Sequence, residues 1–214
     1  IYGYVRYVLP NTSAASQGVK RGDIFYGVDG TQLTIDNWRT LTRADNYSIN
    51  LGSYDDNGTS ETTDDSVTNT SESVTLSKAQ YTENPILVNK VLDVGSKKVA
   101  YLMYNGFTGT DQFNAELNNV FGTFKGANAT ELVLDLRYNP GGSVNTAILL
   151  SSMITGQFTG DVYSTEQWNS EFQEAFENEN PELLINRFVN NNGGASLNSL
   201  NLTRVFVLTT RSSA

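Results

Sequence analysis

The residues best suited to chemistry in this chain form a short run that starts in an apolar strand and ends in two glycines. Residues 134–142 read Leu-Asp-Leu-Arg-Tyr-Asn-Pro-Gly-Gly, a pattern typical of a buried strand that enters a tight turn. Gly141 and Gly142 allow the backbone to approach a ligand closely. Because a helix is predicted over 143–154, their amides can point at an anion beside the start of that helix. An ordinary turn, with glycine for tightness, is the alternative interpretation.

Two charged residues alternate within the strand of this run. Asp135 could orient a catalytic group, and Arg137 could hold a carboxylate. We favour a structural interpretation, in which local amides satisfy one charge and the other is paired at the end of the strand. A phosphate-binding loop is disfavoured, because the chain contains neither GxGxxG nor GxxxxGK[ST].

Histidine and cysteine are both absent from the chain. Within these residues this excludes a Ser-His-Asp triad, an HExxH metal site, a thiolate nucleophile and disulfide bonds. A nucleophilic serine would need another base, for which lysine is the known substitute. Residues 205–214 read as a strand followed by a turn of small residues, so Ser212 and Ser213 are candidate nucleophiles. We favour the plainer interpretation that both are polar residues after a strand.

The composition limits the partners and cofactors of the chain. With a net charge of −9 and no basic run, a nucleic-acid partner is disfavoured. No apolar run approaches the roughly 20 residues of a membrane helix. Residues 53–73 contain six acidic residues and no Lys or Arg, which predicts a mobile loop. Its acids lack the regular spacing of a calcium loop, so we expect no metal, and nothing indicates a cofactor.

The pattern of apolar residues and turns predicts a mixed α/β fold with two domains: residues 1–80, a linker over 81–96, and residues 97–214. In the first domain we expect strands over 3–9, 24–28 and 47–51, with a hairpin turn at Asp29-Gly30 after the second strand. A helix over 14–17 should be capped by Thr12 or Ser13 and closed by Gly18. A second helix should be capped by Asp36.

The second domain is predicted to alternate strands and helices. We expect strands over 99–104, 131–136 and 205–208. Helices are expected after Asp111, which should cap the first of them, over 143–154 and over 168–188. The inward residues should be Phe113, Leu117, Val120, Phe121 and Phe124 in the first helix, and Val144, Ala147, Ile148 and Ile154 in the second. Such an order favours right-handed crossovers in an α/β domain.

The first domain resembles a PDZ-like domain of the bacterial protease type. The residues that carry the resemblance are Pro-Asn-Thr-Ser-Ala-Ala at 10–15, Gly-Val-Lys-Arg-Gly-Asp-Ile at 18–24 and Val-Asp-Gly at 28–30. The resemblance implies a small β-barrel in which a peptide carboxyl end adds as an extra strand. It makes Tyr2, Gly3 and Tyr4 candidate substrate-binding residues, as a remnant of the carboxylate-binding loop.

Residues 134–142, taken with Arg-Ser-Ser-Ala at 211–214, resemble the carboxy-terminal processing (tail-specific) serine peptidases of family S41. The resemblance implies an incomplete ClpP/crotonase-like domain, in which Gly141 or Gly142 supplies an oxyanion donor. Ala214 aligns with the alanine before the catalytic serine, and the family's lysine base lies roughly two dozen residues beyond that serine. The six lysines of the chain all precede this position and match no motif. The fragment alone is therefore expected to be inactive.

The parent protein is accordingly expected to be a serine endopeptidase that acts on polypeptides through their carboxyl ends. Abundant Asn, Ser, Thr and Gly, together with the resemblance, suggest an exported protein in a bacterial periplasm or at the cell surface. The alternative is a non-enzymatic ligand- or peptide-binding protein on the same scaffold, as in the interphotoreceptor retinoid-binding proteins. Residues 156–201 form an unusually long segment that could cover the active site or shape a substrate groove.

Overall fold

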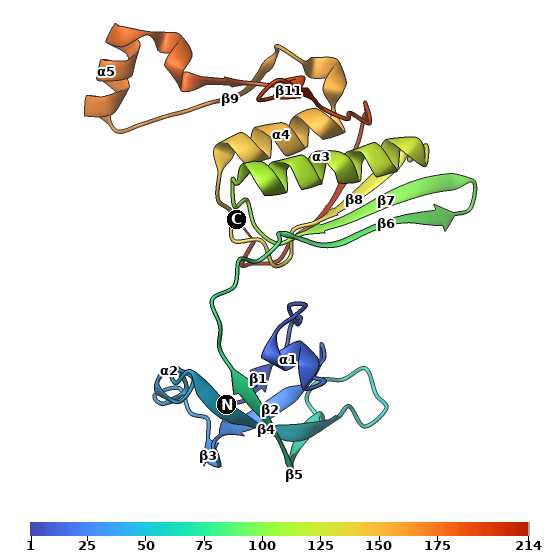
Figure 1. The fold of residues 1–214 in the computed structure, drawn as a ribbon, viewed down its shortest axis with the longest axis vertical. Coiled ribbons are helices and arrows are strands. Elements are labelled where there is room, and N and C mark those ends of the chain that lie inside the picture. Colours follow the sequence, from blue (N-terminus) through green and yellow to red (C-terminus); the bar gives the residue numbers. More distant parts are fainter. Residues whose placement is uncertain (214) are drawn as a thin grey trace. The chain divides into compact units, whose positions relative to one another are not determined.

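A computed structural model describes residues 1–213 of the chain. Ala214, which is predicted to align with the alanine before a catalytic serine, lies outside the described residues. The chain forms two compact units, Ile1–Glu83 and Asn84–Ala214, each built on its own main sheet (Figure 1). The predicted mixed α/β class is confirmed.

The first unit is an antiparallel sheet with two short helices. Its elements are β1 (Gly3–Tyr4), α1 (Ser13–Ser16), β2 (Ile24–Val28), β3 (Thr31–Gln32), α2 (Trp38–Leu41), β4 (Asn46–Asp55) and β5 (Ser66–Ser77). The strands follow the order β1-β2-β4-β5, and β3 also pairs with β2. Val28, Leu33 and Ile49 are buried beneath this sheet's helices and loops. A closed barrel stays a prediction.

The short helices begin where the sequence supplies a hydrogen-bonding side chain. Thr12 caps α1, because its hydroxyl accepts a hydrogen bond from the Ala15 amide at 3.3 Å. Gly18 follows α1 with a φ of 78°, the left-handed conformation expected of it. The prediction that Asp36 caps α2 is wrong. The cap position is Asn37, whose side chain instead accepts from the Thr34 amide at 2.7 Å.

The acidic segment predicted as a loop over 53–73 is mostly strand. β4 continues to Asp55 and β5 begins at Ser66, where the two strands pair residue for residue, so only residues 56–65 connect them. The β-branched residues Val67, Thr68, Thr70, Val74 and Thr75 of β5 favour extended backbone, which the polarity of the segment concealed. The Thr70 hydroxyl also donates to the Leu51 carbonyl at 2.7 Å and ties the two strands together.

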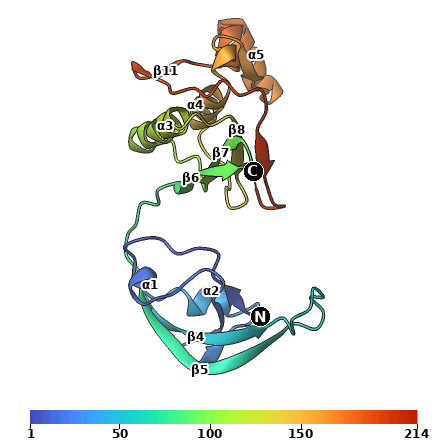
Figure 2. The same cartoon turned by 90° about the vertical axis from the view of Figure 1, so that its right-hand side faces the viewer.

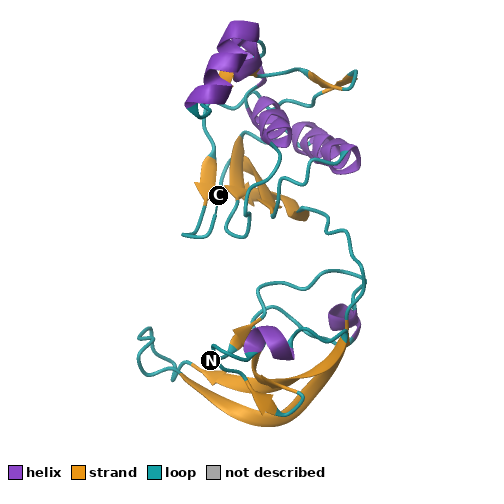
Figure 3. Cartoon of the chain, turned by 90° about the vertical axis from the view of Figure 1, so that its left-hand side faces the viewer, coloured by secondary structure: helices purple, strands orange, loops and turns teal. Residues whose placement is uncertain are grey.

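The second unit is a four-stranded sheet with two helices on one face. β6 (Ile86–Val94), β7 (Lys97–Tyr104), β8 (Glu131–Asp135) and β13 (Phe206–Leu208) lie in the order β13-β8-β7-β6. β7, β8 and β13 are parallel, whereas β6 is antiparallel to β7. Both crossovers step in the same direction across the sheet, so their right-handedness brings α3 (Asp111–Gly126) and α4 (Val144–Ile154) to the same side (Figures 1 and 3).

The main core lies between this sheet and its two helices. It contains Leu102 and Tyr104 of β7, Leu132 and Leu134 of β8, Leu117, Phe121 and Phe124 of α3, and Leu149, Leu150 and Met153 of α4. The predicted inward face of α3 is confirmed, although Thr110, and not Asp111, caps the helix. Val144 is half exposed, contrary to prediction, because it occupies the first position of α4, before the helix reaches the core.

The predicted linker over 81–96 is wrong in its second half. Residues 86–94 form β6, an edge strand that pairs antiparallel with β7 along its whole length. Gly95, with a φ of 59°, makes the tight turn between the two strands. The sequence does not reveal this strand because β6 lies at the edge of the sheet and pairs with β7 alone.

The segment after α4 folds into several short elements. They are a 3₁₀ turn η1 (Gly156–Phe158), β9 (Val162–Thr165), α5 (Ser170–Glu179), a second 3₁₀ turn η2 (Pro181–Leu184), β10 (Ile185–Arg187), β11 (Asn191–Asn192) and β12 (Ala195–Ser196). The prediction of one helix over 168–188 is therefore wrong. Pro181 holds Asn180 in extended backbone (φ −167°, ψ 108°), which ends α5 there. No helix within residues 1–213 combines the length and apolar character needed to cross a bilayer.

Glu131 holds the amino ends of two strands and the segment before a third. Its carboxylate accepts hydrogen bonds from Lys97, at the start of β7, and from Arg204, just before β13. The bonds from Arg204, and then those from Lys97, lower the pKa of Glu131 to about 2. A carboxyl with a depressed pKa stabilises the fold fully above its unfolded value near 4.5, and this contribution is lost as the pH falls towards 2.

We therefore expect Glu131→Gln to lower the urea midpoint at pH 7 and to flatten its decline between pH 4.5 and 2. Glu182→Gln is the matched control, since Glu182 pairs with Arg187 at an exposed position. It should leave the pH profile of the midpoint almost unchanged. If the urea midpoints of Glu131→Gln and of the parent chain fell in parallel between pH 4.5 and 2, Glu131 would not be the source of this pH-dependent stability.

Candidate active site

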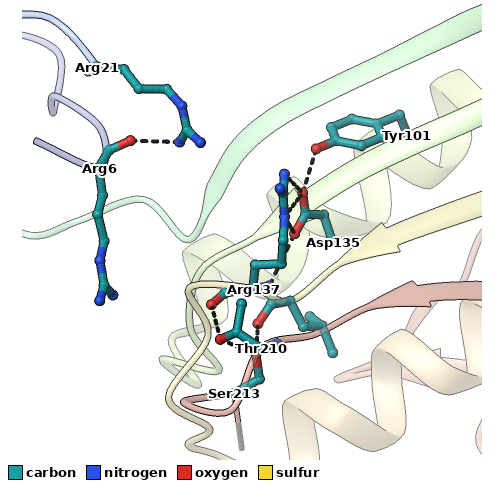
Figure 4. A network of polar contacts seen from close by, with 8 residues as sticks. Arg6, Arg21, Tyr101, Asp135, Arg137, Thr210 and Ser213 are labelled. Carbon is teal, nitrogen blue, oxygen red and sulfur yellow. Dashed lines mark hydrogen bonds and ion pairs between the residues drawn. The ribbon is translucent and has the colours of Figure 1, made fainter. Parts of the chain in front are cut away.

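The carboxyl ends of β7, β8 and β13 meet at one edge of the sheet because the three strands are parallel. We call this edge, with the loops that leave it, the carboxyl edge. In open α/β sheets ligands bind outside this end of the strands. Asp135 is the last residue of β8, and the predicted residues Arg137, Gly141 and Gly142 follow in the loop that leaves this edge. Figure 4 shows Asp135 and Arg137 at this position.

The buried carboxylate of Asp135 is the electrostatic centre of this edge. Asp135 has no exposed surface, and it accepts hydrogen bonds from the Tyr101 hydroxyl at 2.6 Å and from the Arg137 guanidinium at 2.7 and 3.0 Å (Figure 4). The Arg137 amide donates to the same carboxylate at 3.1 Å. The charges of both residues are therefore satisfied locally, as the structural interpretation of the sequence requires.

These contacts decide the protonation of the group. Burial alone would raise the pKa of Asp135, but the hydrogen bonds from Arg137 and Tyr101 outweigh it and lower the pKa below its usual value. Burial, and then the bond to Asp135, raise the pKa of the Tyr101 hydroxyl. At neutral pH Asp135 is ionised and Tyr101 is protonated, so this pair holds structure and does not exchange protons.

The turn that follows β13 is fastened to the end of β8. The Ser213 hydroxyl donates to the Leu136 carbonyl at 2.8 Å, and the Thr210 hydroxyl donates to the Arg137 carbonyl at 3.1 Å (Figure 4). The Ser213 hydroxyl also accepts from the Thr210 amide at 2.9 Å. Ser213 is thus engaged in fixing the turn, which supports the plainer of the two interpretations of this residue. The Ser212 amide points back to the Thr210 hydroxyl at 3.3 Å.

Asn139 builds the glycine turn from inside. It is fully buried, its side-chain amide donates to the Tyr104 carbonyl at 2.9 Å, and its side-chain oxygen accepts from the Gly141 amide at 2.7 Å. The following backbone pairs with Phe107, whose amide donates to the Gly141 carbonyl at 3.0 Å. Asn139 therefore joins the loops that leave β7 and β8.

The two glycines of the turn differ in what their amides are free to bind. The Gly141 amide is occupied by Asn139, whereas the Gly142 amide has no hydrogen-bond partner among residues 1–213. Gly142 is exposed and lies directly before Ser143, the cap of α4, so its N–H is open to a ligand at the amino end of a helix. The geometry thus distinguishes two candidates that the sequence left equal.

Asn105 adds a polar group that the sequence did not reveal. It directly follows β7, is only 7% exposed, and neither atom of its side-chain amide has a partner among the described residues. A buried polar atom without a partner costs about 1–3 kcal/mol, so this amide is suited to meet a bound polar group. Its only sequence signal was its place after a buried strand.

The sequence-predicted substrate residues lie in the other unit. Gly3 and Tyr4 form β1, which pairs with the start of β2, and the side chains of Tyr2 and Tyr4 are exposed. A Cβ on Gly3 would lie 2.1 Å from the Phe25 ring, so glycine is required there by packing.

No group of three acidic side chains in residues 1–213 is arranged to hold a metal ion.

The backbone of Gly142 leaves no room for a side chain. Its φ is +138°, and a Cβ would lie 2.2 Å from the Phe107 carbonyl oxygen. We expect Gly142→Ala to reduce the free energy of unfolding by at least about 2 kcal/mol, measured by urea denaturation. Gly126→Ala, at the end of α3 with open space around it, is the control and should cause no loss. Equal stability of the two variants would show that the turn is not as constrained as described.

Comparison with known proteins agrees with this arrangement. The sequence matches the family model described as peptidase family S41 over residues 98–214. No curated protein matches the sequence. Among solved structures, a putative S41 protease from Bacteroides fragilis is 26% identical, with a TM-score of 0.73 over 99% of this chain and 53% of that protein. The photosystem II D1 C-terminal processing protease is 18% identical, with a TM-score of 0.46 over 100% of this chain and 53% of that one.

The chain therefore spans about half the length of the solved proteins that it matches. The family match covers more than half of the chain and contains the whole carboxyl edge, from β7 to the turn after β13. The chain belongs to peptidase family S41.

Proposed function

We propose that this chain is part of a serine peptidase of the C-terminal processing type, whose nucleophile is a serine that follows Ala214. The observation that carries the proposal is the open Gly142 amide at the same sheet edge as the turn over 210–213. Acyl transfer requires a nucleophile, which would be held after that turn, and a hydrogen-bond donor, which the Gly142 amide supplies from the turn that Asn139 builds. A lysine further along the chain is the proposed base.

In the proposed reaction the serine oxygen attacks the peptide carbonyl and its proton passes to a neutral lysine, whose pKa is lowered by desolvation. The carbonyl oxygen becomes an oxyanion, to which the Gly142 N–H donates a hydrogen bond. The lysine then gives its proton to the leaving amine, and water hydrolyses the acyl-enzyme. Asp135 takes no part in these transfers, because it stays ionised in its pairing with Arg137.

The full-length protein tests the assignment of the nucleophile, with an unstructured polypeptide as substrate. Replacing the serine after Ala214 with alanine should reduce kcat/KM by more than about 10³-fold. Ser213→Ala should cost only about fivefold, mainly in kcat, because one positioning hydrogen bond is worth about 1 kcal/mol. Thr210→Val, which removes the neighbouring tie, is the matched control and should behave alike.

The opposite pattern would overturn the assignment. If Ser213→Ala abolished cleavage while the other serine was dispensable, Ser213 would be the nucleophile. If well-folded full-length protein cleaved no polypeptide, the peptidase proposal itself would fail.

A binding function is the second candidate, and a pocket in the first unit favours it. The pocket has a volume of about 650 Å³, is largely apolar, and is lined by residues that include Val5, Tyr7, Phe25 and Leu76. It begins at Val5, so the predicted residues Tyr2, Gly3 and Tyr4 do not line it. An apolar pocket of this size suits a peptide end or a lipophilic molecule.

Binding measurements on the chain distinguish a peptide end from a lipophilic molecule as the ligand of this pocket. If the first unit selects polypeptide ends, a peptide with a free carboxylate should bind at least about tenfold more tightly than its amidated form, measured by calorimetry. A lipophile that binds while neither peptide does would instead favour the non-enzymatic alternative. Export to a periplasm or cell surface is part of the peptidase proposal. It rests on the composition and on the family resemblance, and fractionation of the source cells tests it.

A further inference from the structure

An arm formed by residues 161–187 extends from the second unit and has no role in the site described above. β9 and β10 pair antiparallel as its stem, and α5 with the turn η2 forms its tip. Figures 1 and 2 show α5 on the side of the α3–α4 layer that faces away from the sheet. None of the residues of α5 is buried, and its packing contacts are with the turn η2 inside the arm.

The arm presents an aromatic cluster to solvent. Trp168, Phe172 and Phe176 follow one another at the spacing of a single helix face, and the Trp168 ring lies 6.2 Å from Phe172 and 5.7 Å from Phe176 between centroids. Trp168 is 50% exposed and Phe172 51% exposed. Trp168 directly precedes the cap of α5, and Phe172 and the half-buried Phe176 lie on the helix. Contacting aromatic rings that are largely exposed mark an interaction surface.

The charge around this cluster has one sign. The arm contains seven acidic residues and one basic residue, a net charge of −6: Asp161, Glu166, Glu171, Glu174, Glu177, Glu179 and Glu182 against Arg187. Arg187 pairs with Glu182, and none of the other acids forms an ion pair with any of the described residues. The aromatic cluster is therefore surrounded by carboxylates that lack counter-charges.

This combination selects the chemistry of the partner. A second copy of the chain would bring an equal cluster of carboxylates against the first, which like-charge repulsion opposes. Nucleic acids and anionic membranes are repelled for the same reason. We propose that the arm is a docking surface for a polypeptide segment in which bulky apolar residues alternate with lysine or arginine. The rings supply the apolar contact, and the carboxylates supply steering and specificity.

The chain has only two tryptophans, which gives a direct measurement. In a Trp38→Phe variant the fluorescence of Trp168 alone reports on the arm. A synthetic peptide built from repeats of Lys-Leu-Phe-Lys should change this fluorescence saturably. Matched peptides of Glu-Leu-Phe-Glu and of Lys-Ser-Ser-Lys should bind at least about tenfold more weakly. The affinity for the first peptide should fall several-fold between about 0.05 M and 0.5 M NaCl.

Variants separate the two contributions to binding. Phe172→Ser should weaken binding by about tenfold or more, because it removes an exposed ring without disturbing the core. Glu174→Gln combined with Glu177→Gln should reduce the dependence on salt. Tyr54→Ser, which removes a ring of similar exposure in the first unit, is the control and should change nothing.

Equal binding of the acidic peptide, or unchanged binding by Phe172→Ser, would overturn the proposal. So would a dimer in sedimentation velocity that is lost on Phe172→Ser, because the occupant would then be a second copy. None of these measurements depends on peptide cleavage, so the docking surface and the peptidase proposal can fail separately.

Discussion

The carboxyl edge of the second unit depends on how the buried charge of Asp135 is compensated. An unpaired carboxylate with no exposed surface would be strongly destabilising, so Arg137 and Tyr101 must stay within hydrogen-bond distance of it. Holding Arg137 by both its amide and its guanidinium fixes the backbone just after β8. The Leu136 and Arg137 carbonyls are then presented to the hydroxyls of the turn after β13. The Asp135–Arg137 ion pair thus fixes the backbone to which the turn after β13 is hydrogen-bonded, and with it the position of that turn.

Most of the fold was predictable because its elements obey local rules. The inward face of α3, a cap of α1 at Thr12 or Ser13, and the glycine after α1 follow from spacing and hydrogen bonding within a few residues, and the structure selects Thr12 as the cap. The failures have a different cause. β6 and the outer half of β5 form because another strand lies beside them, and no periodicity in the segment itself records that neighbour. The helix predicted over 168–188 extends beyond the end of α5 because it does not allow for the stop signal of Asn180-Pro181.

The site was predictable in its residue types but not in its connections. The sequence pointed to Gly141 and Gly142 together, and only the bond from the Gly141 amide to the Asn139 side chain shows which amide is occupied. Tyr101 lies more than thirty residues before its partner Asp135, and the pairing of β7 with β8 brings them together. A prediction of how β7 and β8 pair, residue by residue, would have placed Tyr101 near Asp135. The buried amide of Asn105 carried no signal beyond its place after a buried strand, because an unsatisfied polar group is visible only in three dimensions.

The arm and the carboxyl edge of the second unit stabilise their carboxylates in opposite ways. At the carboxyl edge a carboxylate is buried and therefore needs its own guanidinium, and the result is a rigid backbone. On the arm the carboxylates are exposed, so water solvates them without partners and the local charge remains available to a ligand. An apolar cluster in that field gains little from copies of itself and much from a basic segment that carries large side chains. The charge that makes the arm a poor interface for this acidic chain is therefore what makes it selective for a different one.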